Sequence, residues 1–159
     1  MKFSDAVRQA GLTPSEGLQG LEEGDRKCIR KQSRTIFNGS VNIDASYREI
    51  EPQANRWDYG IGCQVDGVDF AVWVEPHSAA SEHEISMMLR KLQWMKDKLA
   101  TQKFEELRKL TEQTRKKGLR QFWWVTTGRI NIRNGTPQAN RLAQAGLNFP
   151  RKELNIDGG

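Results

Sequence analysis

Side chains able to perform catalysis or bind a metal concentrate in one stretch of the sequence, residues 57–84 (WDYGIGCQVDGVDFAVWVEPHSAASEHE). Both histidines of the chain lie in this stretch, together with several carboxylates. Carboxylate oxygens bind Mg²⁺ and Ca²⁺, and imidazole nitrogens favour transition metals. We therefore expect the functional site among Asp58, Asp69, Glu75, His77, Glu82, His83 and Glu84.

Two of these carboxylates are expected to face each other across a β-hairpin. The dipeptide Asp66-Gly67 is a strong two-residue turn signal, and it separates two apolar, β-branched runs, Trp57–Cys63 and Val68–Val74. A turn there places Asp58 opposite Glu75. Two carboxylates on adjacent strand ends can hold a divalent cation, which would activate water and neutralise charge on a phosphodiester.

The neighbouring elements must position this hairpin. Alternating residues from Thr35 to Asp44 predict a preceding strand, and Pro76 is expected to end the second strand of the hairpin. Ser81 and Glu84 have the spacing of a capping box at the start of a helix. That helix has an apolar stripe at the helical period: Ile85, Met88, Leu89, Leu92, Met95 and Leu99.

The remaining elements complete a mixed α/β chain. Ser4 and Thr13-Pro14 predict the starts of two N-terminal helices. After the helix that follows the hairpin, we expect a second helix over 102–117, a buried strand over 121–127 and a last helix from Thr136 to Ala145. We expect a single α/β (α+β) domain, 1–159. It would have a mixed central sheet, helices on both sides and the core order α-β-β-β-α-β, since a helical crossover permits a parallel strand pair.

This order and the hairpin residues resemble the PD-(D/E)XK nuclease superfamily, in which an Asp lies on the second strand and Glu/Asp-x-Lys ends the third. The matching residues are Asp58 and Glu75-Pro76-His77. The resemblance covers about residues 15–127 and leaves a basic helical C-terminal extension, 128–159. It implies phosphodiester hydrolysis in nucleic acid that depends on Mg²⁺ or Mn²⁺ bound by Asp58 and Glu75.

Two departures from the motif bear on activity. Arg56-Trp57 precedes Asp58 where the family has Pro, and His77 occupies the position of the lysine. In some members of the superfamily the lysine comes from the following helix, and Lys91 is the candidate here. We expect His77 or Lys91 to position the attacking water.

Two other interpretations remain open. Without a suitably placed lysine, the chain would be an inactive module of the same fold that binds nucleic acid or a protein partner. Alternatively, Glu75, His77 and His83, with Glu82 or Glu84 nearby, would form a site for a transition metal in a Zn-dependent hydrolase or a metal-binding protein.

The charge distribution predicts a polyanionic partner. Residues 101–159 carry 12 Lys/Arg against 5 Asp/Glu in a chain with net charge +5. Clustered basic residues gain from displacing the counterions of nucleic acid. The candidate nucleic-acid-binding residues are Arg115, Lys116, Lys117, Arg120, Arg129, Arg133 and Arg141.

No apolar run is long enough to span a membrane, and the N-terminus lacks the apolar core of a secretory signal. Cys28 and Cys63 form no disulfide framework. We therefore expect a cytoplasmic protein that does not bind membranes.

Overall fold

A four-stranded mixed sheet is the centre of the fold in a computed structural model that describes residues 1–31 and 34–156. The strands lie in the order β2 (Ile36–Asn42), β3 (Tyr59–Val65), β4 (Val68–Pro76) and β5 (Phe122–Val125). The pairs β2–β3 and β3–β4 are antiparallel, whereas β4–β5 is parallel because helices connect them. The expected α/β class and core order are confirmed.

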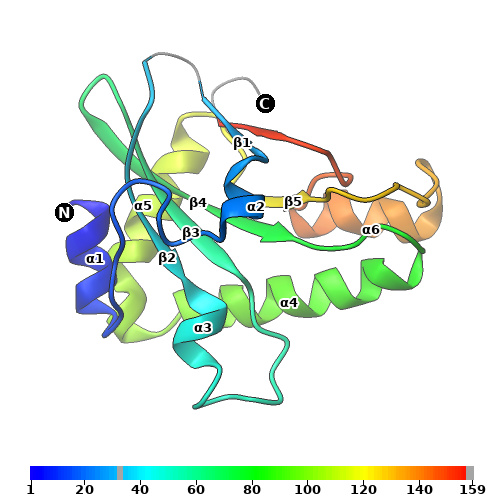
Figure 1. The fold of residues 1–159 in the computed structure, drawn as a ribbon, viewed down its shortest axis with the longest axis horizontal. Coiled ribbons are helices and arrows are strands. Elements are labelled where there is room, and N and C mark those ends of the chain that lie inside the picture. The colour runs from blue at the N-terminus through cyan, green and yellow to red at the C-terminus, as the bar shows by residue number, and fades with distance from the viewer. Residues whose placement is uncertain (32–33, 157–159) are drawn as a thin grey trace.

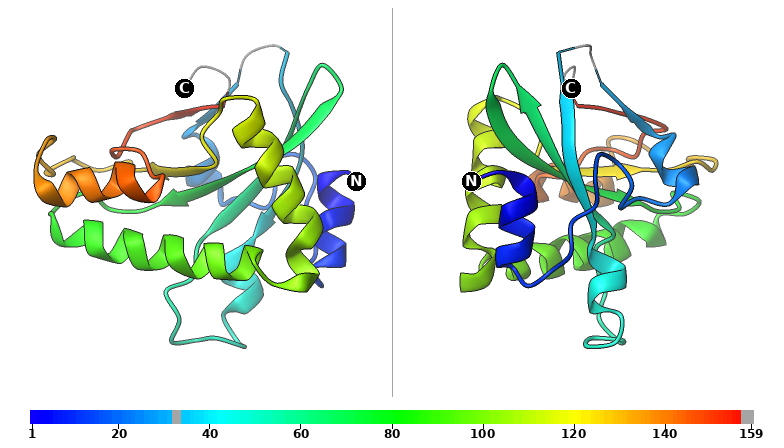
Figure 2. Two further views of the ribbon diagram at one scale, coloured as in Figure 1. Left: turned by 180° about the vertical axis from the view of Figure 1, so that it is seen from behind. Right: turned by 60° about the vertical axis from the view of Figure 1, so that its left-hand side comes forward.

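Four helices cover one face of the sheet, as Figure 2 shows from behind. They are α1 (Phe3–Gln9), α4 (His83–Leu99), α5 (Glu105–Lys116) and α6 (Pro137–Ala145). The 3₁₀ turn η1 (Gln102–Phe104) joins α4 to α5, and α3 (Ile43–Tyr47) follows β2. The opposite face carries the short α2 (Glu23–Arg26) and a parallel pair of two-residue strands, β1 (Ile29–Arg30) and β6 (Leu154–Asn155) (Figure 1).

The alternation in β4 divides the apolar core into two parts. Ala71 and Trp73 belong to the cluster under the four helices, and Phe70, Val72 and Val74 belong to the cluster on the other face. The alternation arises because successive strand residues point to opposite faces. The stripe on α4 is buried as predicted, with Leu89 only partly covered.

The turn that closes the hairpin has the conformation its sequence indicates. Asp66 and Gly67 both have positive φ, 50° and 79°, as a type I′ turn requires. The resulting register pairs Tyr59 with Val74 and continues to Val65 and Val68 at the turn. This register places Asp58, one residue before β3, opposite Glu75.

Three local predictions at helix starts are wrong. No helix begins at Thr13, because the backbone of Ser15 forms an isolated bridge with Ser40 at the edge of the sheet and is extended there. Helix α1 begins at Phe3, with Lys2 rather than Ser4 as its N-cap. Helix α4 begins at His83 without a side-chain cap, so the predicted capping box of Ser81 and Glu84 does not form.

The residues after β5 pack against the sheet. Leu147 and Arg151 form parallel bridges with Phe122 and Val125, and β6 pairs with β1. The predicted helix from Thr136 is present, with the Thr136 side chain as its cap. Residues 157–159 of the expected extension lie outside the described residues. Across the part of the chain that is described, no helix is both long enough and apolar enough to span a lipid bilayer.

Candidate active site

Asp58 and Glu75 are held together by a backbone hydrogen bond at the ends of β3 and β4. The amide of Asp58 donates to Oε1 of Glu75 at 2.8 Å. The carbonyl of Asp58 accepts from the amide of Ile43 at 2.7 Å, which anchors this residue to the end of β2. The Asp58 side chain is 25% exposed, whereas that of Glu75 is fully buried. The structure therefore brings together the two carboxylates that the turn predicted.

Lys91 completes this cluster from α4. Its Nζ lies 2.7 Å from Oε2 of Glu75 and 4.0 Å from Oδ1 of Asp58. This ammonium group is therefore close to both carboxylates. The more N-terminal Glu84 of the same helix contacts His77 instead.

His77 joins the cluster because the strand geometry continues beyond Pro76. The His77 amide donates to the carbonyl of Val125 at 2.9 Å, and its carbonyl accepts from Nε1 of Trp124. The imidazole therefore points the same way as Glu75, with Nδ1 3.8 Å from Oε2 of Glu75. Its Nε2 lies in contact with a carboxylate oxygen of Glu84 without the alignment of a hydrogen bond.

Glu75, Asp58 and Lys91 retain protons more strongly than the same groups in water, whereas His77 retains its proton less strongly. Burial and the neighbouring Asp58 raise the pKa of Glu75 to about 8, although Lys91 opposes this. Burial also raises the pKa of Asp58 to about 6. Burial alone would lower the pKa of Lys91, but contact with Glu75 leaves it raised. Burial lowers the pKa of His77, and the positive charge of Lys91 lowers it further. Glu84 acts in the opposite direction.

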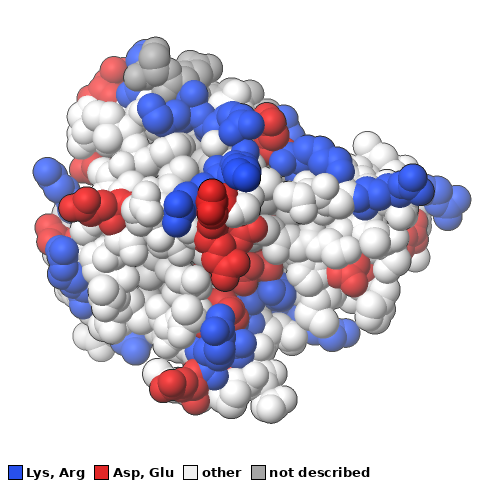
Figure 3. All heavy atoms as spheres, in the orientation of Figure 1, with Lys and Arg blue, Asp and Glu red and all other residues white. Residues whose placement is uncertain are grey.

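Further carboxylates extend the negative potential around Asp58. Asp44, Asp25 and Glu22 each raise its pKa through their charges. Figure 3 shows acidic residues in a band that runs from α2 towards α3, with Lys and Arg gathered above it. No local pattern in the chain indicates this band, because its members belong to elements far apart in sequence. Tyr59 connects two of these elements, since its hydroxyl donates to Asp25 at 2.6 Å.

The oxygen ligands of the site suit a hard divalent cation. Mg²⁺ is usually held by one or two carboxylates together with water and substrate oxygens, rather than by a cage of protein ligands. Each oxygen of Glu75 accepts one hydrogen bond and keeps a second lone pair. The partly exposed carboxylate of Asp58 has no hydrogen-bond donor among the described side chains. The pair Asp58 and Glu75 therefore fits Mg²⁺ or Mn²⁺.

Of the set expected for a transition metal, Glu75 and Glu84 lie in contact with His77, whereas among the described residues no ion-pair contact joins His83 to them. His83 is exposed at the start of α4, and Glu82 lies 3.7 Å from Arg133. Within residues 1–31 and 34–156, no group of three or more His, Cys, Asp or Glu side chains has the geometry of a metal site. Asp69 lies at the far end of the hairpin, where it accepts from Asn38 and Gln64.

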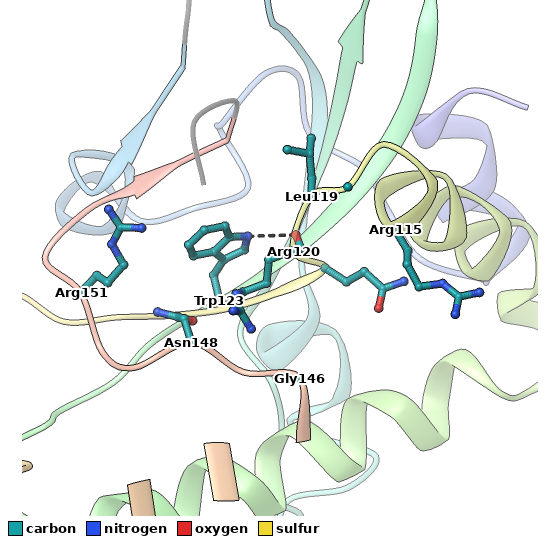
Figure 4. A pocket seen from close by; sticks show the side chains of 9 residues that line it. Arg115, Leu119, Arg120, Trp123, Gly146, Asn148 and Arg151 are labelled. Atoms are coloured by element: carbon teal, nitrogen blue, oxygen red, sulfur yellow. Dashed lines mark hydrogen bonds between the residues drawn. The ribbon is translucent and has the colours of Figure 1, made fainter. Parts of the chain in front are cut away.

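The seven predicted nucleic-acid-binding residues lie at the end of α5, in the segments before and after β5, and on α6. Arg129, Arg133 and Arg141 lie after β5 and on α6. Lys116 and Lys117 lie at the end of α5, and Lys117 approaches the ring of Phe70 at 5.5 Å. Of the seven, Arg115 and Arg120 share a pocket (Figure 4), and there they are joined by Arg151.

Sequence reasoning misses Arg151, and it gives Glu84 two alternatives, a helix cap or a place near His77. Arg151 lies outside the predicted set because the uninterrupted basic run ends at Arg141. The spacing of Glu84 from Ser81 predicts a helix cap, whereas the side chain contacts His77. Comparisons of this chain with protein-family models, with characterised proteins and with solved structures found no match. The functional argument therefore depends on the geometry of the site.

Proposed function

We propose that this chain is a nuclease-like domain that hydrolyses phosphodiester bonds in nucleic acid with Mg²⁺ or Mn²⁺. The observation that supports this most strongly is the position of Lys91, whose Nζ lies between Glu75 and Asp58 at 2.7 and 4.0 Å. The ion bound by Asp58 and Glu75 would polarise the scissile phosphate and lower the pKa of the attacking water.

The residues of the chain have separate roles in this proposal. The amide of Asp58 and the ammonium of Lys91 each hold one oxygen of Glu75, which fixes the orientation of that carboxylate. Lys91 also supplies a positive charge next to the place where the phosphate becomes more negative. His77, held by its contact with Glu84, is placed to position the attacking water or accept its proton.

A plasmid-cleavage assay tests the proposal. Wild-type protein with Mg²⁺ or Mn²⁺ is expected to cut the plasmid. Asp58→Asn should reduce the rate by about 100-fold or more, because it removes the partly exposed carboxylate ligand. Asp69→Asn is the matched control, since Asp69 lies on the same hairpin and accepts from Asn38, away from the cluster. No cleavage by wild-type protein, or equal cleavage by Asp58→Asn, would contradict the catalytic assignment.

One observation favours a second candidate function, a module of the same fold that binds nucleic acid without cutting it. Glu75 is fully buried and Lys91 neutralises it directly, as in a structural ion pair. In this case the protein would bind nucleic acid in a salt-sensitive way without any metal. Failure to bind at low salt would instead point to a protein partner.

The proposal includes a cytoplasmic location. Cys28 is a buried free thiol, which suits a reducing compartment. Fluorescence microscopy of a tagged protein tests this location, and a fully extracellular or periplasmic signal would contradict it.

A further inference from the structure

A pocket of about 560 Å³ lies on a different part of the molecule from the cluster of Asp58 and Glu75. It lies where the C-terminal ends of α5 and α6 approach β5, and three of its lining residues are arginines. Figure 4 shows Arg120 and Arg151 at different edges of the Trp123 ring, with Arg115 farther away at the end of α5. The Cζ atoms of Arg120 and Arg151 lie 5.8 and 5.9 Å from the ring centroid.

In the part of the chain that the structure describes, few acidic groups oppose the positive charge of this pocket. No Asp or Glu lines the pocket, and among the described residues neither Arg120 nor Arg151 has a carboxylate within ion-pair distance. Arg115 pairs with Glu112, but both side chains are largely exposed, so this contact is weak. Burial lowers the pKa of Arg120, which is the expected result for a partly desolvated cation without a partner.

The guanidinium groups are the charged hydrogen-bond donors that this pocket offers to a ligand, because the side-chain amides that line it already donate to backbone carbonyls. The amide nitrogen of Asn148 donates to the carbonyls of Trp124 and Phe149, and that of Gln121 donates to the carbonyl of Thr111. Trp123 is 3% exposed, and its Nε1 donates to the carbonyl of Arg120. The buried indole therefore cannot stack on a base, and its role here is to support the two arginines.

The two helix ends at the rim do not cancel this charge. A helix C-terminus carries about half a negative charge. The end of α6 is already bonded by Lys96, whose Nζ donates to the carbonyl of Ala145. The left-handed residues Gly118 and Gly146 close the two helices, and backbone amides there donate to carbonyls of the last turns, Thr114 and Arg115 in α5 and Leu142 and Ala143 in α6. Three guanidinium groups exceed these partial charges, and the pocket remains positive.

We propose that this pocket binds a phosphate group of a nucleic-acid strand, held by Arg120 and Arg151 with Arg115 at the rim. Planar guanidinium groups bind phosphate oxygens in a bidentate way. The inference rests on the nucleic-acid partner of the proposed function, and it adds a specific binding site to it. Strand β5 connects the pocket to the active site, because Trp123 lines the pocket and the next residue, Trp124, pairs in register with Glu75.

Binding of short oligonucleotides in EDTA tests this site without requiring cleavage. Fluorescence anisotropy would compare labelled oligonucleotides of about 12 nucleotides, a length within the usual range of single-strand sites, with a 5′-phosphate and with a 5′-hydroxyl. The variant Arg120→Gln/Arg151→Gln is expected to bind about tenfold more weakly or worse, because each arginine donates charge-assisted hydrogen bonds to the phosphate. The slope of log K against log salt should also become shallower by about 0.7 for each phosphate of a single strand that the variant no longer neutralises.

Two further variants make the result specific. Lys2→Gln/Arg8→Gln removes the same charge from exposed residues at α1 and should change binding by less than about twofold. Arg120→Lys/Arg151→Lys keeps the charge but removes the planar fork, so it should retain the salt slope and lose affinity. Far-UV circular dichroism and thermal melts confirm that each variant is folded.

The two oligonucleotides distinguish the source of the phosphate. If Arg120→Gln/Arg151→Gln loses affinity only for the 5′-phosphorylated oligonucleotide, the pocket binds a terminal phosphate monoester. If the variant loses affinity equally for both oligonucleotides, the pocket binds an internal phosphodiester. Wild-type affinity in Arg120→Gln/Arg151→Gln would overturn the site, even if Asp58→Asn abolishes cleavage. Arginine-dependent binding in a protein that never cuts would support the site and contradict only the catalytic assignment. Absence of binding by wild-type protein would overturn the site as well.

Discussion

Nζ of Lys91 lies 2.7 Å from Oε2 of Glu75, a carboxylate whose side chain is fully buried at the end of β4. This contact joins α4 to the sheet at the place where the amide of Asp58 holds the other oxygen of Glu75. A buried carboxylate with a paired lysine and a partly exposed second carboxylate provides charge stabilisation and cation ligands in one cluster. The same contact is a structural ion pair, so its contributions to stability and to activity must be measured separately.

Lys91→Met is expected to destabilise the protein by about 3 kcal/mol at about pH 9, above the pKa of Glu75, because it leaves the ionised, buried Glu75 carboxylate without its partner. Urea denaturation of the variant and wild type would measure the loss. The double variant Lys91→Met/Glu75→Gln should recover most of it, since no buried charge then remains. A single variant as stable as wild type would show that Glu75 is neutral or solvated in the folded protein.

Stability should fall as pH rises through the range in which the carboxylates ionise. The pKa of Asp58 is raised from its usual value near 3.8 to about 6, and that of Glu75 is raised to about 8. At a pH between the pKa of a carboxyl in the unfolded state and its higher pKa in the folded state, the folded state binds more protons. The free energy of unfolding therefore decreases as pH rises through that range. For Asp58 this window is about pH 4 to 6, and for Glu75 it extends to about 8.

The comparison that isolates Asp58 is wild type against Asp58→Asn. Groups that do not interact with Asp58 titrate alike in both proteins and cancel in the difference; Glu75, whose pKa Asp58 raises, cancels only below its pKa in the variant. The stability of wild type relative to the variant should decrease by about 2 kcal/mol from about pH 4 to 7, since one pKa unit corresponds to about 1.4 kcal/mol. A difference that is independent of pH would contradict the raised pKa of Asp58.

Mg²⁺ or Mn²⁺ should raise the melting temperature if Asp58 and Glu75 bind it. The cation would supply the positive charge that the cluster otherwise takes from protons. At about ten times its dissociation constant, the ion adds about 1.4 kcal/mol, or about 4 °C in Tm. Differential scanning fluorimetry measures this shift, and it should disappear in Asp58→Asn but persist in Asp69→Asn. An unchanged Tm in wild type at millimolar Mn²⁺ would oppose the metal site.

Gly60→Ala is expected to cost about 2 kcal/mol, because a Cβ there would lie 2.5 Å from the Trp73 ring. The ring has little freedom to move, since its Nε1 donates to Thr111 on α5. Gly24→Ala in α2 is the control, because nothing lies within 4 Å of the added Cβ. Thermal unfolding of the two variants would show the difference, and equal stabilities would contradict the tight packing of Trp73 under β3.

Local patterns along the chain predict the hairpin and much of the fold. The Asp66-Gly67 turn determines which residues face each other, so Asp58 opposite Glu75 follows directly from the register. The stripe on α4 and the end of α6 at Gly146 are also predictable. The failed prediction at Thr13 has a physical cause: a hydrogen-bonded bridge between Ser15 and Ser40 replaces the local helix signal.

The turn, the strand alternation and therefore the pair Asp58 and Glu75 follow from the amino-acid sequence alone, because they depend on backbone geometry over a few residues. Three contacts follow only from tertiary packing: Lys91 with Glu75, Glu84 with His77, and Arg151 beside Arg120 at Trp123. They depend on how far each helix is displaced along the sheet and where the C-terminal segment crosses β5. The packing of whole apolar faces sets those displacements, and no short pattern in the chain encodes them.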